Sequence, residues 1–210
     1  MNIGMIVLQI FVLFMALTFH EFAHGWAARR LGDQTAESQG RLTLNPIAHI
    51  DPFGTILLPA ILILSRSPIL FGWAKPVPVN PLNFRNPRKG MMWSALAGPG
   101  SNLLLAVILT IFLKLLLMMG FLSQGILMFF NMAIQLNVFL AMFNLIPIPP
   151  LDGGRVLVGL LPREQAYAYS QIEPYGFLIV MGLVYFNIID RVLSYPTALI
   201  FGLLRVIINW

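Results

Sequence analysis

The chain alternates long apolar runs with short polar breaks, and the apolar runs are long enough to form membrane-spanning helices. The first run begins near residue 3, carries no charged side chain up to residue 19 and ends before Gly32-Asp33. A helix of that extent is about 43 Å long, more than the roughly 30 Å of a bilayer's hydrocarbon core. Comparable helices are predicted at about 91–118 and 125–146, and weaker ones at about 174–189 and 196–209.

Residues 40–90 depart from this pattern. The stretch 53–71 is apolar but interrupted by prolines and one arginine, and the stretch 72–90 is rich in X-Pro steps, which favour extended backbone. Basic residues flank 53–71 on both sides, so the positive-inside rule puts both flanks on the cytosolic side. We therefore expect a re-entrant or kinked hairpin at 53–71, within an extended insert at 40–90.

Composition narrows the class of protein. The chain is 58% hydrophobic and 10% charged, with a mean hydropathy of +0.82, whereas a soluble domain has about 25% charged residues. The predicted fold is an all-α polytopic membrane protein with about five transmembrane helices. We expect one domain, 1–210, with a core at 3–160, a short amphipathic helix at 154–161 and C-terminal helices at 170–210.

The charge and the cysteine count exclude some functions. The net charge is +5, but the basic residues gather at segment ends rather than in a stripe with aromatics. This favours contact with lipid headgroups and argues against nucleic-acid binding. The chain has no cysteine, so any metal must be held by nitrogen and oxygen. The first run lacks a basic start and a clear cleavage site, which predicts a retained helix rather than a signal peptide.

The stretch His20-Glu21-Phe22-Ala23-His24 carries the strongest chemical signal. Ionisable groups at bilayer depth cost roughly 2.5–3.5 kcal/mol each, so their presence there indicates function. On a helix the two histidines share one face and reach a single metal ion, while Glu21 lies beside them as a candidate general base. The pattern predicts one zinc ion. The alternative is that both histidines only bond to neighbouring carbonyls.

A catalytic zinc site needs a third protein ligand. Prolines at 147, 149 and 150 break the helix before Asp152, which frees the chain to turn this carboxylate back toward the first helix. Alternatively, Asp152 caps the short helix that follows it. The other candidates for the third ligand are His49, Asp51, Asp33 and Glu37.

Two further segments bear on the site. Asn144 lies in the last turn before the proline break, where its amide can donate to an oxyanion or a substrate backbone, or cap the helix. The segment Gly98-Pro-Gly-Ser-Asn102 opens the helix at 91–118 with small residues, for which close helix packing is the favoured interpretation.

Together, the His20–His24 motif, the Gly98–Asn102 motif and the run from Asn144 to Gly153 resemble the site-2 protease family of intramembrane zinc metalloproteases. The resemblance covers about residues 3–160 and looks like a minimal form without a PDZ-like or CBS-like domain. It implies that His20, His24 and Asp152 bind zinc, that Glu21 is the general base and that Asn144 belongs to the active site.

The activity that this resemblance implies is hydrolysis of peptide bonds in or near transmembrane segments of other proteins. We expect a multi-pass protein of the cell membrane with its active site toward the cytosol. Residues 72–81 are considered as an edge on which an unwound substrate strand pairs. A proton-coupled transporter and a catalytically silent relative remain as alternatives. The sequence carries no signal for the oligomeric state or for the identity of the substrate.

Overall fold

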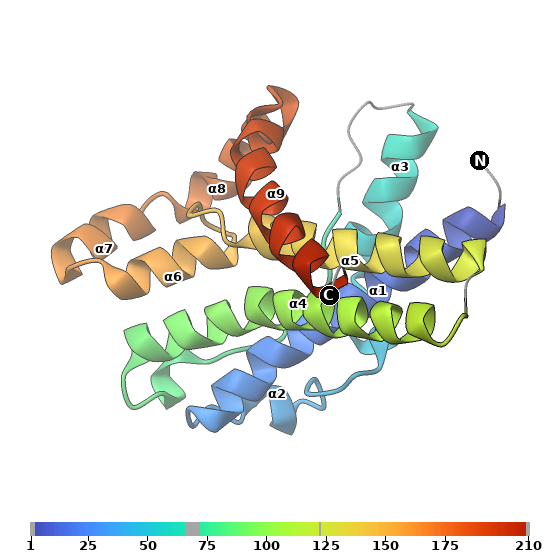
Figure 1. The fold of residues 1–210 in the computed structure, drawn as a ribbon. Helices are drawn as coiled ribbons and strands as arrows, with labels where there is room; N and C mark the ends of the chain where they lie inside the picture. The colour runs from blue at the N-terminus through green and yellow to red at the C-terminus, as the bar shows by residue number, and fades with distance from the viewer. Residues whose placement is uncertain (1–2, 66–71, 122, 209–210) are drawn as a thin grey trace.

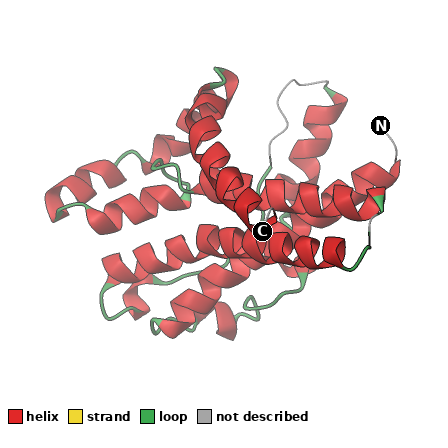
Figure 2. Ribbon diagram, viewed as in Figure 1, coloured by secondary structure: helices red, strands yellow, loops and turns green. Residues whose placement is uncertain are grey.

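The computed structural model describes residues 3–65, 72–121 and 123–208, and these residues form helices and loops without a β-strand (Figure 2). The all-α prediction is therefore confirmed. The elements, in chain order, are α1 Ile3–Arg30, α2 Thr35–Ser38, η1 Pro46–His49, η2 Pro52–Leu57, α3 Leu58–Leu64, η3 Pro81–Asn83, α4 Pro87–Met118, α5 Gln124–Asn144, α6 Asp152–Leu160, α7 Arg163–Ser170, η4 Glu173–Tyr175, α8 Gly176–Tyr185 and α9 Ile188–Ile208.

Within the described residues, four helices are long and apolar enough to cross a membrane: α1, α4, α5 and α9. The predicted span at 174–189 instead contains the ten-residue helix α8, whose length of about 15 Å is half of the hydrocarbon core. Large apolar side chains on one face of α4 are exposed, at Leu104, Ile108, Phe112 and Leu115. Their spacing of three or four residues makes a continuous apolar stripe suited to lipid.

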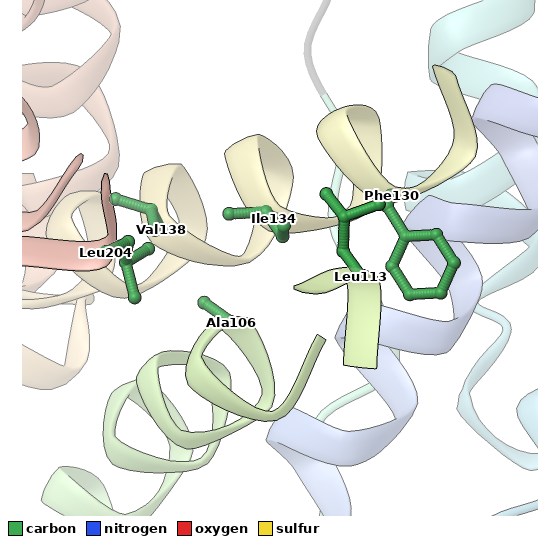
Figure 3. Packing of buried hydrophobic residues seen from close by; sticks show 6 residues of the cluster. All are labelled: Ala106, Leu113, Phe130, Ile134, Val138 and Leu204. Carbon is green, nitrogen blue, oxygen red and sulfur yellow. The ribbon is translucent and has the colours of Figure 1, made fainter. Parts of the chain in front are cut away.

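Helix α4 lies at the centre of the molecule, with α1, α5 and α6 packed against it and α9 across α4 and α5 (Figure 1). The main apolar core lies where α4, α5 and α9 meet (Figure 3). It includes Phe130, Ile134 and Val138, whose spacing of four residues puts them on one face of α5. Ala106 and Leu113 of α4 and Leu204 of α9 complete the core.

Several helix boundaries differ from the predicted ones. Helix α4 begins at Pro87, because Asn86 caps it by accepting from the Lys89 N–H at 3.2 Å. The Gly98–Asn102 motif consequently lies inside α4 rather than near its start. Helix α6 begins two residues earlier than predicted, and α9 begins eight residues before Pro196, which lies inside it. Helix α7 was not predicted.

The insert makes a hairpin. Its outgoing arm consists of the π-helical turn η2 and helix α3. The returning arm, which begins at residue 72, is hydrogen-bonded to the start of the outgoing arm. The Trp73 N–H donates to the Gly54 carbonyl at 3.1 Å, and the Thr55 hydroxyl donates to the Trp73 carbonyl at 2.7 Å. The two flanks of 53–71 thus lie together, as the hairpin prediction requires. Residues 66–71 of that segment lie outside the described residues.

Candidate metal centre

His20 and His24 of α1 face Asp152 at the first position of α6. The Nε2 atoms of the two histidines lie 3.1 Å and 3.2 Å from the same carboxylate oxygen, Asp152 Oδ2. The imidazole rings stand edge to face, with their centroids 4.6 Å apart. One ligand atom from each of the three residues lies within 4.8 Å of the others, so the group could hold a single metal ion.

The chain reaches this position through a tight turn after α5. Asp152 is the first residue of α6, and Leu151, which makes no side-chain cap, is the N-cap. The alternative in which Asp152 serves as the cap is therefore wrong, and its carboxylate is free to face α1. Glycines allow the turn, because a Cβ on Gly153 would lie 2.3 Å from the Leu145 carbonyl oxygen and one on Gly154 would lie 2.7 Å from Pro149 N.

Both imidazoles are hydrogen-bonded to α4 through Nδ1, the ring nitrogen remote from Asp152. His24 Nδ1 is 2.7 Å from the Ser94 carbonyl oxygen, which only accepts, so His24 carries its proton on Nδ1. His20 Nδ1 is 2.6 Å from Asn102 Oδ1. Each ring thus turns Nε2 toward Asp152. A hydrogen bond on the remote nitrogen is the usual device that orients a metal-binding histidine.

Gly98 makes room for the two rings on the surface of α4. A Cβ at this position would lie 2.4 Å from His24 Nε2 and 2.8 Å from His20 Cε1. The expected close packing of the Gly98–Asn102 motif is therefore present, and it is packing against the candidate ligands themselves. Within the motif, Gly98 leaves space for the two rings and Asn102 is hydrogen-bonded to His20.

Glu21 is half-buried beside this group, and one of its carboxylate oxygens is engaged. Glu21 Oε2 accepts a hydrogen bond of 2.8 Å from the Val77 N–H. Val77 lies between two prolines in the returning segment of the insert, so it supplies the one N–H of residues 76–78. The insert therefore reaches the candidate base directly.

The insert segment 72–80 is extended but offers few donors to a substrate strand. The N–H groups of Trp73, Lys75 and Val77 bond to the Gly54 carbonyl, the His49 carbonyl and Glu21. Arg41 donates to the carbonyls of Lys75 and Pro76 at 2.9 and 3.2 Å. These bonds leave little of the segment available for the strand pairing that was considered.

The chemistry of the donor set fits zinc. Two imidazole nitrogens, each of which offers a lone pair when it carries no proton, and one carboxylate oxygen are the donor types of a three-ligand catalytic zinc site, which leaves a position for water. Burial alone would raise the pKa of the Asp152 carboxyl, but the two imidazoles that face it hold that pKa below its usual range.

The other four candidates for the third ligand form hydrogen bonds or an ion pair with groups other than His20, His24 and Asp152. His49 Nε2 bonds to the Thr43 carbonyl, and Asp51 accepts from two backbone N–H groups at the start of η2. Asp33 accepts from Thr35, Asn80 and Asn83, and Glu37 pairs with Arg29 at 2.8 Å.

Asn144 lies at the last position of α5, and its amide donates to the Leu140 carbonyl one turn back at 3.0 Å. Among the described residues, no hydrogen bond links it to the three candidate ligands. Sequence reasoning missed Asn137 and underrated Asn102, both buried in apolar helices. The signal for them was the same as for the histidines, a strongly polar side chain within an apolar run.

Known proteins resemble this chain over most of its length. Residues 118–186 match the family described as Peptidase family M50. A Bacillus subtilis (strain 168) protein named "Putative zinc metalloprotease YwhC" is 45% identical over 180 residues, which cover 83% of this chain and 78% of that protein. A Mycolicibacterium smegmatis protein named "Putative zinc metalloprotease Rip2" is 34% identical over 202 residues, 90% of this chain and 71% of that protein. No solved structure matches.

The YwhC match and the Rip2 match each span more than two thirds of both proteins, and both relatives are named as zinc metalloproteases. The four apolar helices fit a multi-pass membrane protein. The chain therefore belongs to peptidase family M50, the site-2 protease family, and is a zinc-dependent membrane metalloprotease.

Proposed function

We propose that this metalloprotease hydrolyses peptide bonds in or near transmembrane segments of other membrane proteins, with His20, His24 and Asp152 as the zinc ligands and Glu21 as the general base. One observation carries the proposal: the three ligand atoms lie within 4.8 Å of one another, and two of them come from α1, a helix long and apolar enough to cross a membrane. His20 lies about 14 Å along α1 from Arg29, nine residues away, and therefore below the headgroups. A protease centre at that depth acts on peptide bonds that are themselves in the membrane.

The side chains divide the chemistry among them. Zinc, when bound, supplies the Lewis acidity that lowers the pKa of water and polarises a peptide carbonyl. Glu21 takes a proton from the attacking water and passes it to the leaving amide nitrogen. The Val77 N–H on Oε2 fixes the carboxylate and leaves Oε1 for the proton. We include Asn144 as a substrate-facing residue, which donates to the substrate once its amide releases the Leu140 carbonyl.

A transmembrane substrate must unwind before it is cleaved. In an intact helix the carbonyls are hydrogen-bonded within the segment, and unsatisfied backbone groups are costly in lipid. Water and substrate therefore meet in the protein interior, beside buried residues such as His20 and Asp152. We further propose that the protein resides in the cell membrane with this centre toward the cytosol, because Arg29, Arg30 and Arg41 follow the HExxH segment at its basic end.

Metal analysis and cleavage together test this function. We expect purified wild-type protein to hold about one zinc per chain. Asp152→Ala removes one of three ligands and is expected to lose most of the zinc. Glu21→Gln removes the base but no ligand, so it is expected to keep the zinc and to lose cleavage of single-span reporter helices in phospholipid vesicles, by about 100-fold or more.

Two outcomes would contradict the proposal. Undiminished zinc in Asp152→Ala would remove this residue from the ligand set. Cleavage by Glu21→Gln at the wild-type rate would leave the reaction without the proposed base. The variant Asp51→Ala is the control for loss of a loop carboxylate, since Asp51 caps η2 away from the centre.

A further inference from the structure

Hydrogen bonds through two buried asparagines link α5 to Nδ1 of His20. Asn137 Nδ2 donates to the Ala133 carbonyl at 2.8 Å, and Asn137 Oδ1 accepts from Asn102 Nδ2 at 2.8 Å. Asn102 Nδ2 also donates to the Ala16 carbonyl at 3.1 Å, while Asn102 Oδ1 meets His20 Nδ1 at 2.6 Å. The exposed fractions of Asn102 and Asn137 are 0% and 2%, so water does not compete for these groups.

The two backbone carbonyls in this set of hydrogen bonds fix the direction of each bond. The Ala133 carbonyl only accepts, so Asn137 must turn its NH₂ toward it and its oxygen toward Asn102. Asn102 then uses both amide hydrogens, on Ala16 and on Asn137, and has only its oxygen left for His20. His20 must therefore donate from Nδ1, which leaves the lone pair on Nε2, the atom that faces Asp152.

We propose that Asn137 is a positioning residue for the metal centre: acting through Asn102, it holds His20 in the tautomer that presents Nε2 to zinc. This inference rests on the proposed zinc ligation by His20. His24 needs no such relay, because the Ser94 carbonyl imposes the same tautomer on it directly. His20 faces a side-chain amide instead, and an amide can flip unless something fixes it. Asn137, anchored on Ala133, fixes it together with the Ala16 carbonyl.

Helix α5 supplies a matched control. Asn131 and Asn137 both donate to the carbonyl four residues back, at 2.8 Å in each case. Asn131 lies at the exposed surface, whereas Asn137 continues to Asn102. The two residues thus share the helix, the residue type and the local hydrogen bond, and differ in the link to the site.

Zinc affinity of the full-length protein in detergent, measured by competition with a chelator, tests the proposal. We expect Asn137→Leu to bind zinc about 10- to 100-fold more weakly than wild type, the usual effect of losing a partner that orients a ligand. Asn131→Leu is expected to bind zinc as wild type does. Asn137→Asp, as a buried neutral acid, can donate to Ala133 and accept from Asn102, so it is expected to restore most of the affinity. Wild-type affinity in a folded Asn137→Leu would overturn the proposal.

A measurement on the wild-type protein decides the matter if Asn137→Leu does not fold. The chain has three histidines, so ¹⁵N-histidine labelling gives a spectrum that is simple to assign. We expect the metal-free protein, in which no metal on Nε2 imposes the tautomer, to show the His20 proton on Nδ1, and a proton on Nε2 would overturn the relay. The variant His20→Ala tests the zinc ligation separately from the relay, because unchanged zinc binding in this variant would contradict the proposed ligation itself.

Discussion

At Gly98 the addition of a single methyl group should disturb the two candidate histidine ligands. A Cβ there would lie 2.4 Å from His24 Nε2, closer than real Cβ atoms approach a neighbour. The rings cannot retreat easily, because each is held by a hydrogen bond to α4. We therefore expect Gly98→Ala to weaken zinc binding at least 10-fold, the size of effect seen when a ligand's orientation is lost. Chelator competition on the purified variant measures this.

Gly100, two residues later on the same helix, is the control for that substitution. A Cβ at Gly100 meets nothing within 4 Å, and alanine is the better helix former by up to about 1 kcal/mol. Gly100→Ala should therefore keep the zinc affinity and hold or raise the thermal stability. Equal zinc affinity in the two variants would mean that the rings tolerate a methyl group at Gly98.

Residue patterns predicted part of this centre. The spacing of His20 and His24 predicted a shared face, and the prolines before Asp152 predicted that the chain turns there. The structure brings these three residues together, and their binding of zinc stays a prediction. Asn102 was interpreted as helix packing and Asn137 was not singled out. Their roles depend on which side chains of α4 and α5 face α1, and a single sequence does not give that information.

The long apolar helices were predicted well in place and less well in extent. The long helices α1, α4 and α5 follow from their apolar runs. The start of α4 at Pro87 was readable from Asn86-Pro87, a cap followed by a proline at the first helical position. The start of α9 was predicted near Pro196, whereas the helix begins at Ile188, because an apolar helix packed against neighbours tolerates an internal proline.

Asp33 follows α1 and is hydrogen-bonded to the segment that precedes α4, and we call this set of hydrogen bonds the Asp33 clamp. The Asp33 carboxylate accepts from the Thr35 N–H, the Asn80 N–H and the Asn83 amide. The Thr35 hydroxyl also donates to this carboxylate. Burial alone would raise the pKa of Asp33, but the hydrogen bonds outweigh the effect of burial and hold the pKa below its usual range. A carboxyl with a lowered folded-state pKa stabilises the fold above its unfolded pKa of about 3.9. That contribution is lost as the pH falls through the folded-state pKa.

This clamp predicts a pH-dependent stability that a single substitution removes. Asp33→Asn turns an N–H group toward donors such as the Asn80 N–H, and is expected to destabilise the protein by about 1–3 kcal/mol. The thermal midpoint of the variant should fall less between pH 6 and pH 3 than that of wild type. Asp190→Asn, at an exposed carboxylate, is the control. An Asp33→Asn variant with the pH profile of wild type would argue against the clamp.

At the scale of the whole molecule, the hairpin of the insert determines on which side of the membrane each loop lies. Because residues 54 and 73 are hydrogen-bonded, the chain that leaves α1 returns to the same side before α4 begins. Helices α4 and α5 then cross and return, which brings Asp152 back to His20. In Figure 1 the α4–α5 connection lies at the N-terminal end of α1, and α2, α6 and α7 lie toward the opposite end.

The absence of cysteine from the sequence makes this arrangement directly testable, because any introduced thiol is unique. Gln39 follows α2, Tyr167 lies on α7 and Phe121 lies in the α4–α5 connection, and all three are exposed. We expect Gln39→Cys and Tyr167→Cys to react with a membrane-impermeant maleimide from the cytosolic face, and Phe121→Cys only from the opposite face. If Gln39→Cys and Tyr167→Cys were labelled from different faces, an odd number of crossings would separate them, and Asp152 could not meet His20 in the membrane. Labelling of both from the external face would keep the site intact and reverse its proposed orientation.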